Sequence, residues 1–146
     1  MDWIAKCIDP SRLRQGMKNA KDHQRMDLYW QAFRRLCEVE GLNYDDPLER
    51  EFYSTLAAYE ELLSEKNGHT TRASRTRQKL QRSGVIQCLE DWAVANTPTD
   101  GFKLLIDSGL IELTGEYLVL KYPARFSSKA LSRARSRLEE AGWKCA

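Results

Sequence analysis

Residues 45–68 read DDPLEREFYSTLAAYEELLSEKNG, and this stretch determines the class of fold. Its apolar residues recur at spacings of three and four, the pattern of an α-helix with one buried face. Asp46-Pro47 is a typical helix start, because the aspartate caps free N–H groups and proline at the first helical position has none to lose. Asn67-Gly68 is a typical end. We therefore predict a helix over about 47–66 with Leu48, Phe52, Leu56, Tyr59 and Leu63 on its inner face.

The sequence N-terminal to this stretch predicts two more helices. Asp9-Pro10 repeats the start signal and is followed by apolar residues at helical spacing, namely Leu13, Met17 and Ala20. The next helix is expected to begin near residues 25–27 and to stop at Gly41. Its apolar side consists of Tyr29, Trp30, Phe33, Leu36, Cys37 and Val39.

The sequence C-terminal to the same stretch predicts three helices in succession. Thr70 or Thr71 is expected to cap a basic helix that ends at Gly84. The following helix, over about 85–92, should end before Thr97-Pro98, because the residue before proline disfavours the α region. Thr99 or Asp100 then caps a short helix that stops at Gly109 and carries Phe102, Leu105 and Ile106.

Residues 110–122 are compatible with two structures. The spacing of their leucines favours a helix, whereas residues 116–122 alone also fit a strand. We predict a helix, because no second strand is available and an isolated strand would leave its backbone groups without hydrogen bonds. Pro123 should end it. Ser127 is expected to cap the last helix, which has Leu131, Ala134, Leu138 and Ala141 on its inner face.

These patterns predict an all-α protein, built as one domain (residues 1–146) from an irregular bundle or array of about seven helices. Residues 1–66 and 67–146 are the subdivision to consider. A composition of 42% hydrophobic and 30% charged residues is that of a globular chain. No apolar run approaches the ~18–20 residues of a membrane helix, and residues 1–7 lack the apolar core of a signal peptide. We expect a soluble cytoplasmic protein that does not bind membranes.

The residues that usually carry chemistry are few and scattered. The two histidines, His23 and His69, lie in polar segments, and burial of Cys37 and Cys88 on apolar faces would raise their pKa and make them poor nucleophiles. The sequence has no glycine-rich phosphate loop, no C-x-x-C pair and no His-Glu-x-x-His motif. We therefore expect a non-enzymatic protein without metal, cofactor or small-molecule substrate. We also expect free thiols at all four cysteines, which are Cys7, Cys37, Cys88 and Cys145.

The net charge of +2 conceals alternating blocks of charge. Residues 38–65 carry nine acidic side chains and one basic one, whereas residues 66–82 carry six basic and no acidic side chains. On a helix the cations Arg72, Arg75, Lys79 and Arg82 fall within one quadrant. Together with threonine and serine hydroxyls and the free N–H groups of a helix start, these arginines suit phosphate contacts. The last helix has a second row of cations, Lys129, Arg133 and Arg137.

Three interpretations of these cations stay open at this point. Carboxylates from residues 38–65 are close enough in the chain to pair with the basic helix, which would make it an ordinary internally paired surface. Alternatively, the cations contact nucleic acid or an acidic protein partner.

The helix expected over 26–41 also contains a candidate surface. Tyr29, Phe33 and Leu36 keep the spacing of a buried face, whereas Trp30 and Arg34 lie off that line and four residues apart. Tryptophan beside arginine is typical of protein-interface hot spots and of base-stacking platforms. We therefore add Trp30 and Arg34 to the predicted partner-binding or nucleic-acid-binding residues.

Several short segments of the C-terminal half have a familiar composition: RTRQ at 75–78, GVI at 84–86, EDWA at 90–93, TDGF at 99–102 and EYLVL at 116–120. Through them, residues 66–140 resemble small, functionally uncharacterised helical proteins of bacteria and their phages or mobile elements. The resemblance implies an all-helical fold and a mobile-element origin, and it assigns no functional residue.

The sequence thus predicts a non-enzymatic binding protein that docks on a protein or nucleoprotein complex through charged, aromatic-containing helix faces. If the chain is phage-borne, an inhibitor of a host nucleoprotein defence complex, of the anti-CRISPR type, is a natural special case, because complementary charge accelerates docking. The alternative is a direct DNA- or RNA-binding protein that uses the basic helix 70–82.

Overall fold

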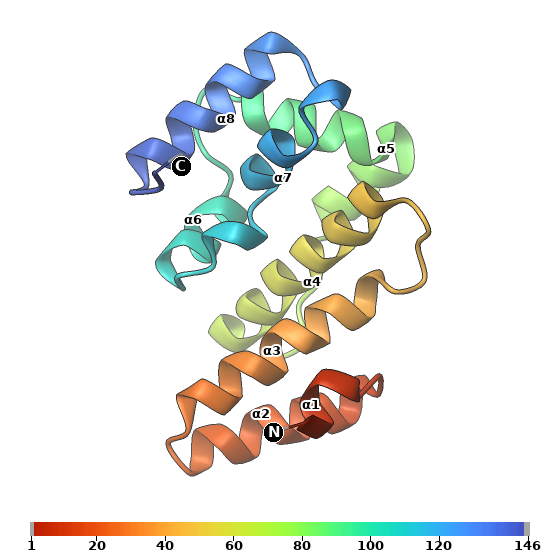
Figure 1. The fold of residues 1–146 in the computed structure, drawn as a ribbon, viewed down its shortest axis with the longest axis vertical. Coiled ribbons are helices and arrows are strands. Elements are labelled where there is room, and N and C mark those ends of the chain that lie inside the picture. Colours follow the sequence, from red (N-terminus) through yellow and green to blue (C-terminus); the bar gives the residue numbers. More distant parts are fainter. Residues whose placement is uncertain (1, 145–146) are drawn as a thin grey trace. The chain divides into compact units, whose positions relative to one another are not determined.

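The computed structural model describes residues 2–144, which form eight α-helices and two short 3-10 helices and no strand (Figure 1). The prediction of an all-α fold is confirmed. The chain divides into two compact units, Met1–Ala58 and Tyr59–Ala146, and the division falls inside one long helix, α4. A single-domain organisation stays a prediction. Among residues 2–144, no helix combines the length and apolar composition needed to cross a membrane.

The first unit contains α1 (Asp2–Lys6), α2 (Pro10–Asp22), α3 (Met26–Gly41) and the beginning of α4 (Pro47–Asn67). Helices α2 and α3 form a hairpin of neighbouring helices, and α1 contacts α3 (Figure 1). The predicted start at Asp9 is confirmed, because its Oδ1 accepts a hydrogen bond of 3.0 Å from the Ser11 N–H. Its core includes the predicted inner residues Leu13, Phe33, Leu36, Leu48, Phe52 and Leu56, whereas Trp30 and Val39, predicted on the apolar side of α3, are only half-buried.

The turn between α2 and α3 is closed by two backbone hydrogen bonds. The Arg25 N–H donates to the Ala20 carbonyl at 2.7 Å, and the Gln24 N–H donates to the Lys21 carbonyl at 3.1 Å. This is the Schellman pattern, in which the residue after the helix cap adopts the left-handed region. Here that residue is Gln24, with φ of 58° in place of the usual glycine.

Gly41 ends α3, but not for the reason that the sequence suggested. It is buried, and the next residue, Leu42, keeps a right-handed conformation with φ of −65°. A Cβ at Gly41 would collide with the backbone carbonyl of Arg50 in α4. The glycine is therefore needed for the close approach of two helices, and not for a left-handed stop.

The second unit contains the rest of α4, then α5 (Ser74–Val94), α6 (Asp100–Asp107), η1 (Ile111–Leu113), α7 (Gly115–Lys121), η2 (Pro123–Arg125) and α8 (Ser128–Glu140). Helices α7 and α8 pack against each other and against α5 (Figure 1). The predicted caps Thr99 and Ser127 are confirmed by hydrogen bonds from the N–H groups of Phe102, at 3.1 Å, and Ala130, at 3.0 Å.

The ambiguous stretch 110–122 is helical, as predicted, but it is two short helices and not one. Thr114 separates them: its Oγ1 donates to the Ile111 carbonyl at 2.7 Å and accepts from the Tyr117 N–H at 3.3 Å. Gly115 follows at a close approach to α5, since a Cβ there would lie 2.7 Å from Cε3 of Trp92. The glycine thus lets α7 rest directly on α5.

The inner face of α8 differs in part from the predicted one. Ala134 and Leu138 are buried as expected, but Leu131 and Ala141 are only half-buried. Ala130 and Arg137 are buried in their place. The buried face of α8 is therefore rotated toward a residue that the sequence assigned to the solvent.

Candidate functional site

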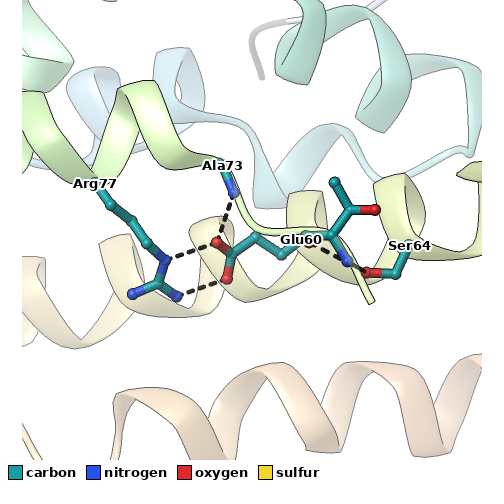
Figure 2. A network of polar contacts seen from close by, with 5 residues as sticks. Glu60, Ser64, Ala73 and Arg77 are labelled. Atoms are coloured by element: carbon teal, nitrogen blue, oxygen red, sulfur yellow. Dashed lines mark hydrogen bonds and ion pairs between the residues drawn. The ribbon is translucent and has the colours of Figure 1, made fainter. Parts of the chain in front are cut away.

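The predicted basic helix begins at Ser74, and neither Thr70 nor Thr71 caps it. The N-cap residue is Ala73, which has no side chain able to cap. Residues 68–73 instead follow α4, where Ser64 Oγ accepts a hydrogen bond of 2.8 Å from the Thr71 N–H and donates to the Thr71 carbonyl at 3.2 Å (Figure 2). The predicted caps are therefore wrong, and a second side chain of α4 instead binds the N–H of the N-cap residue, Ala73.

The side chain that binds the Ala73 N–H is Glu60, in α4. Its carboxylate accepts from the Ala73 N–H at 2.8 Å and, through both oxygens, from Nε and Nη2 of Arg77 at 2.7 and 2.6 Å (Figure 2). Burial, the largest influence, raises the pKa of Glu60, but the hydrogen bonds from Arg77 and Ala73 and the charge of Arg77 outweigh it. The pKa of Glu60 is therefore lowered. The start of α5 and Arg77 thus already hold an anion.

The four cations that the sequence grouped together have different environments. Arg75 and Arg82 are exposed and make no ion pair or hydrogen bond within residues 2–144; we call them the exposed α5 cations. Lys79 lies between them on the helix and pairs with Asp91, Nζ to Oδ2, at 2.6 Å. Arg72 is exposed but precedes the helix, so the predicted quadrant contains three residues and not four.

The Lys79–Asp91 pair depends on a sharp bend in α5. Gly84, where the sequence predicted a helix end, has φ of 83° and ψ of 172°, which is not helical. In a straight helix, two residues twelve positions apart would be separated by about 18 Å along the axis. Hydrogen bonds from Lys79 and then Gln87, whose amide donates to Asp91 at 2.7 Å, lower the pKa of Asp91. The bend therefore brings a carboxylate next to the basic face.

The second row of cations, on α8, is only partly on the surface. Lys129 and Arg133 are exposed, as predicted. Arg137 is 9% exposed, so its assignment to a binding surface is wrong. Its guanidinium donates to the carbonyls of Trp92 at 2.8 Å and Ala95 at 2.6 Å, which lie at the end of α5. An exposed helix end would leave these carbonyls to water, and here Arg137 satisfies them.

The charge of Arg137 is balanced by Glu116, in the first turn of α7, at 3.3 Å. Glu116 is 2% exposed, and burial raises its pKa against the opposing effects of a backbone hydrogen bond and of Arg137. Neither residue is accessible to a macromolecular partner. Together they join α5, α7 and α8, and their role in this structure is to hold the second unit together.

Trp30 and Arg34 belong to the first unit and are both half-buried. The Trp30 ring packs edge-on against Tyr29, with centroids 5.0 Å apart, and against Phe33, at 5.1 Å. Tyr29 and Phe33 themselves are buried, as the periodicity predicted. Trp30 thus covers the core with part of its ring and leaves part of it on the surface.

Residues of possible catalytic type are not gathered in the described part of the chain. His23 and His69 are exposed, and Cys37 and Cys88 are buried, as predicted. Burial raises the pKa of the Cys88 thiol, with Lys79 opposing and Asp91 adding to the effect. Within residues 2–144, no three His, Cys, Asp or Glu side chains are placed to hold a metal ion. The predicted free thiol at Cys145 lies outside the described residues.

The structure therefore leaves Arg75 and Arg82, with Arg72, Lys129 and Arg133, as the accessible members of the predicted basic surface. Of the carboxylate partners, Glu60 belongs to the acidic residues that the sequence offered for pairing with the basic helix, whereas Asp91 and Glu116 were not predicted. Comparison with known proteins adds no assignment, because no protein family, curated protein or solved structure matches the chain.

Proposed function

We propose that this chain is a non-enzymatic binding protein that docks on a protein or nucleoprotein partner through its exposed α5 cations. The observation that supports this is the contrast among the cations of α5. Arg77 and Lys79 are paired with carboxylates, whereas Arg75 and Arg82 face solvent without a partner among the described residues. Unpaired arginines are suited to bidentate contacts with carboxylates of another surface.

A protein partner is favoured over naked nucleic acid by the charge around these arginines. The start of α5, where free N–H groups would receive a phosphate, already carries the Glu60 carboxylate. Asp91, with a side chain 38% exposed, lies beside Lys79 on the same face. Such a mixed surface repels a polyanionic backbone at some points and attracts it at others, whereas a protein partner can place a complementary charge opposite each residue.

The experiment is affinity capture from the native host with the double variant Arg75→Glu/Arg82→Glu as comparator. Partners identified by mass spectrometry with the unmodified protein should be depleted with this variant, because charge reversal places like charges opposite each other. Lys103→Glu, an exposed charge reversal in the same unit, is the matched control and should retain them. Equal recovery with both variants would show that Arg75 and Arg82 do not form the interface.

The alternative, direct binding to DNA or RNA through residues 70–82, has a different signature. Binding should weaken steeply as salt is added, because each neutralised phosphate releases counterions. With the few cations left unpaired in this region, the slope of log affinity against log salt should be shallow, at about −2 to −4. A gel shift that Arg75→Glu/Arg82→Glu abolishes at low salt would support this alternative, and no shift with any DNA or RNA would refute it.

The proposal includes Trp30 and Arg34 as a second surface and, as a special case, a phage-encoded inhibitor of a host nucleoprotein defence complex. Trp30→Ala/Arg34→Ala should release at least part of the captured partners if this surface takes part.

For the special case, expression of the chain in a host with an active defence complex should restore plasmid or phage survival. Unchanged survival in every host tested would remove it.

A further inference from the structure

The first unit contains an open cavity of about 370 Å³ between α1 and the turn that joins α2 to α3. One wall is apolar and consists of Trp3, Ile4 and Leu28. The polar rim, formed by the last turns of α2 and the residues after it, consists of Asn19, His23 and Arg25. The size lies at the small end of the range for small-molecule sites, which is about 300–1,000 Å³, and the combination of apolar wall and few polar groups is their usual lining.

The apolar wall is held in place by its neighbours. Trp3 packs against Gly16 of α2 so closely that a Cβ on Gly16 would lie 2.9 Å from Cη2 of the indole. The guanidinium of Arg12 lies 4.9 Å from the centroid of the same ring, which is the geometry of a cation–π contact. The indole is therefore positioned from two sides while part of it remains exposed to the cavity.

The polar rim offers hydrogen-bond donors. Asn19 Oδ1 accepts from the Gln15 amide at 2.9 Å, which leaves the Asn19 NH₂ group to face another acceptor. Arg25 donates from Nε and Nη2 to the Asp27 carboxylate, at 3.1 and 2.9 Å, and its Nη1 remains as a donor for a ligand. None of the residues that line the cavity is acidic. The rim is thus matched to an acceptor oxygen.

The backbone of the turn after α2 fixes the position of the polar rim, and the charged side chains of α2 support the same ligand type. His23 is the C-cap residue and Arg25 the last residue of the Schellman turn, so two backbone hydrogen bonds fix where both side chains start. Helix α2 also carries Arg12, Arg14, Lys18 and Lys21 against a single acidic residue, Asp22. These cations outnumber the nearby carboxylates of Asp22 and Asp27, and their excess positive charge favours an anion, against the opposing dipole at the C-terminal end of α2.

We propose that this cavity binds a small aromatic carboxylate, with its ring against Trp3 and Leu28 and its carboxylate at Asn19, His23 and Arg25. The site is separate from the proposed macromolecule-binding function, since all of these residues belong to the first unit and the exposed α5 cations belong to the second. The apolar wall recognises the aromatic body of such a ligand, and the polar rim recognises its carboxylate oxygens.

The test is a titration of the full chain, labelled with ¹⁵N, with naphthalene-2-acetate, and with 2-(2-naphthyl)ethanol as the neutral analogue. We expect saturable shifts of the amides of Gly16, Asn19 and His23 and of the Trp3 indole N–H. The alcohol should bind about tenfold more weakly, because it loses the charge-assisted hydrogen bonds. No saturable shift at these groups, or equal affinity for the two compounds, would overturn the proposal.

Arg25→Gln, with Lys18→Gln as its control, tests where the carboxylate of the ligand lies. Arg25→Gln should weaken the carboxylate about tenfold and leave the alcohol unchanged. Lys18→Gln removes the same charge from an exposed position of α2 outside the cavity and should change neither affinity. Equal losses in both variants would mean that a general field and not a site attracts the ligand.

Leu28→Ala should weaken the carboxylate and the alcohol by the same factor, because both compounds share the apolar body. Trp3→Ala gives the same test at a second residue of the apolar wall, and the amide spectrum of α2 and α3 shows whether each variant is folded. Unchanged binding in two folded variants would exclude the apolar wall.

Discussion

Replacement of Glu60 by alanine tests whether a single carboxylate organises the start of α5. In the structure this carboxylate is the acceptor for one backbone N–H and for two nitrogens of Arg77 (Figure 2). Alanine removes all three hydrogen bonds and leaves the helix propensity of α4 intact or slightly improved. The loss of stability therefore reports on the contacts and not on α4 itself.

The magnitude follows from the two kinds of contact. Loss of the acceptor leaves the Ala73 N–H without its hydrogen bond, which costs about 1 kcal/mol. The Glu60 side chain is 12% exposed and Arg77 is 39% exposed, so the pair contributes less than a buried one, about 1–2 kcal/mol after solvent screening. We expect Glu60→Ala to lower the free energy of unfolding by about 2–3 kcal/mol, or the melting temperature by about 6–10 °C.

The pH dependence of the free energy of unfolding tests the contribution of Glu60 independently. Because the pKa of Glu60 is lowered in the folded protein, its contribution is complete above the pKa of the unfolded chain, about 4.3, and is lost as the pH falls through the folded value. The difference between the unmodified protein and Glu60→Ala should therefore be full at pH 7 and smaller at pH 3. Other titrating groups are shared by both proteins and cancel in the difference.

The assay is urea unfolding followed by circular dichroism at both pH values, with amide hydrogen exchange of residues 74–80 as the local measurement. Glu140→Ala, an exposed carboxylate on α8, is the matched control and should stay within about 0.5 kcal/mol. The reasoning would be refuted by a Glu60→Ala protein that is as stable as the control at pH 7. A deficit that does not change between pH 7 and pH 3 would refute the electrostatic part alone.

Three further substitutions test other features of the structure by urea unfolding. Gln24→Gly should stabilise the protein by about 1 kcal/mol, because Gln24 has a positive φ that glycine adopts without strain; no gain would contradict the left-handed turn. Gly84→Ala should cost about 1–3 kcal/mol from backbone strain alone, since nothing lies within 4 Å of the added Cβ; a neutral result would contradict the bend. Arg137→Met should cost about 3–5 kcal/mol by stranding the buried Glu116, and the deficit should shrink on acidification as the carboxyl is protonated; a deficit of under 1 kcal/mol would contradict that pairing.

Helices and most of their ends were predictable because their causes are local. The caps at Asp9, Thr99 and Ser127 each bond an N–H two or three residues away, so the residue types in one short window decide the outcome. The start of α5 was not predictable in this way. Its cap, Glu60, is thirteen residues before Ala73, and no window around residue 73 contains it.

Glycines were recognised as special positions but not for the right reason in every case. At Gly84 the backbone is left-handed, which sequence reasoning anticipates when it predicts a helix end. At Gly41 and Gly115 the backbone is ordinary, and the glycine is required because Arg50 or Trp92 from another helix occupies the space of a Cβ. Sequence alone gives both kinds of glycine the same appearance, because the second kind depends on tertiary packing.

The wrong prediction that Arg137 is exposed on α8 conflicts with helical geometry alone. Residues four apart do not form a straight row, since each step of four advances about 40° around the axis. From Lys129, Arg133 is therefore turned by about 40° and Arg137 by about 80°, whereas the buried Ala130 stands at about 100°. Arg137 thus lies about 20° from the buried face before any tertiary contact is considered. Burial of an arginine there requires acceptors, and the carbonyls at the end of α5 and the Glu116 carboxylate provide them. The position of Arg137 was inferable from α8 alone, but its three acceptors come from α7 and from the end of α5, and only the fold brings them to it.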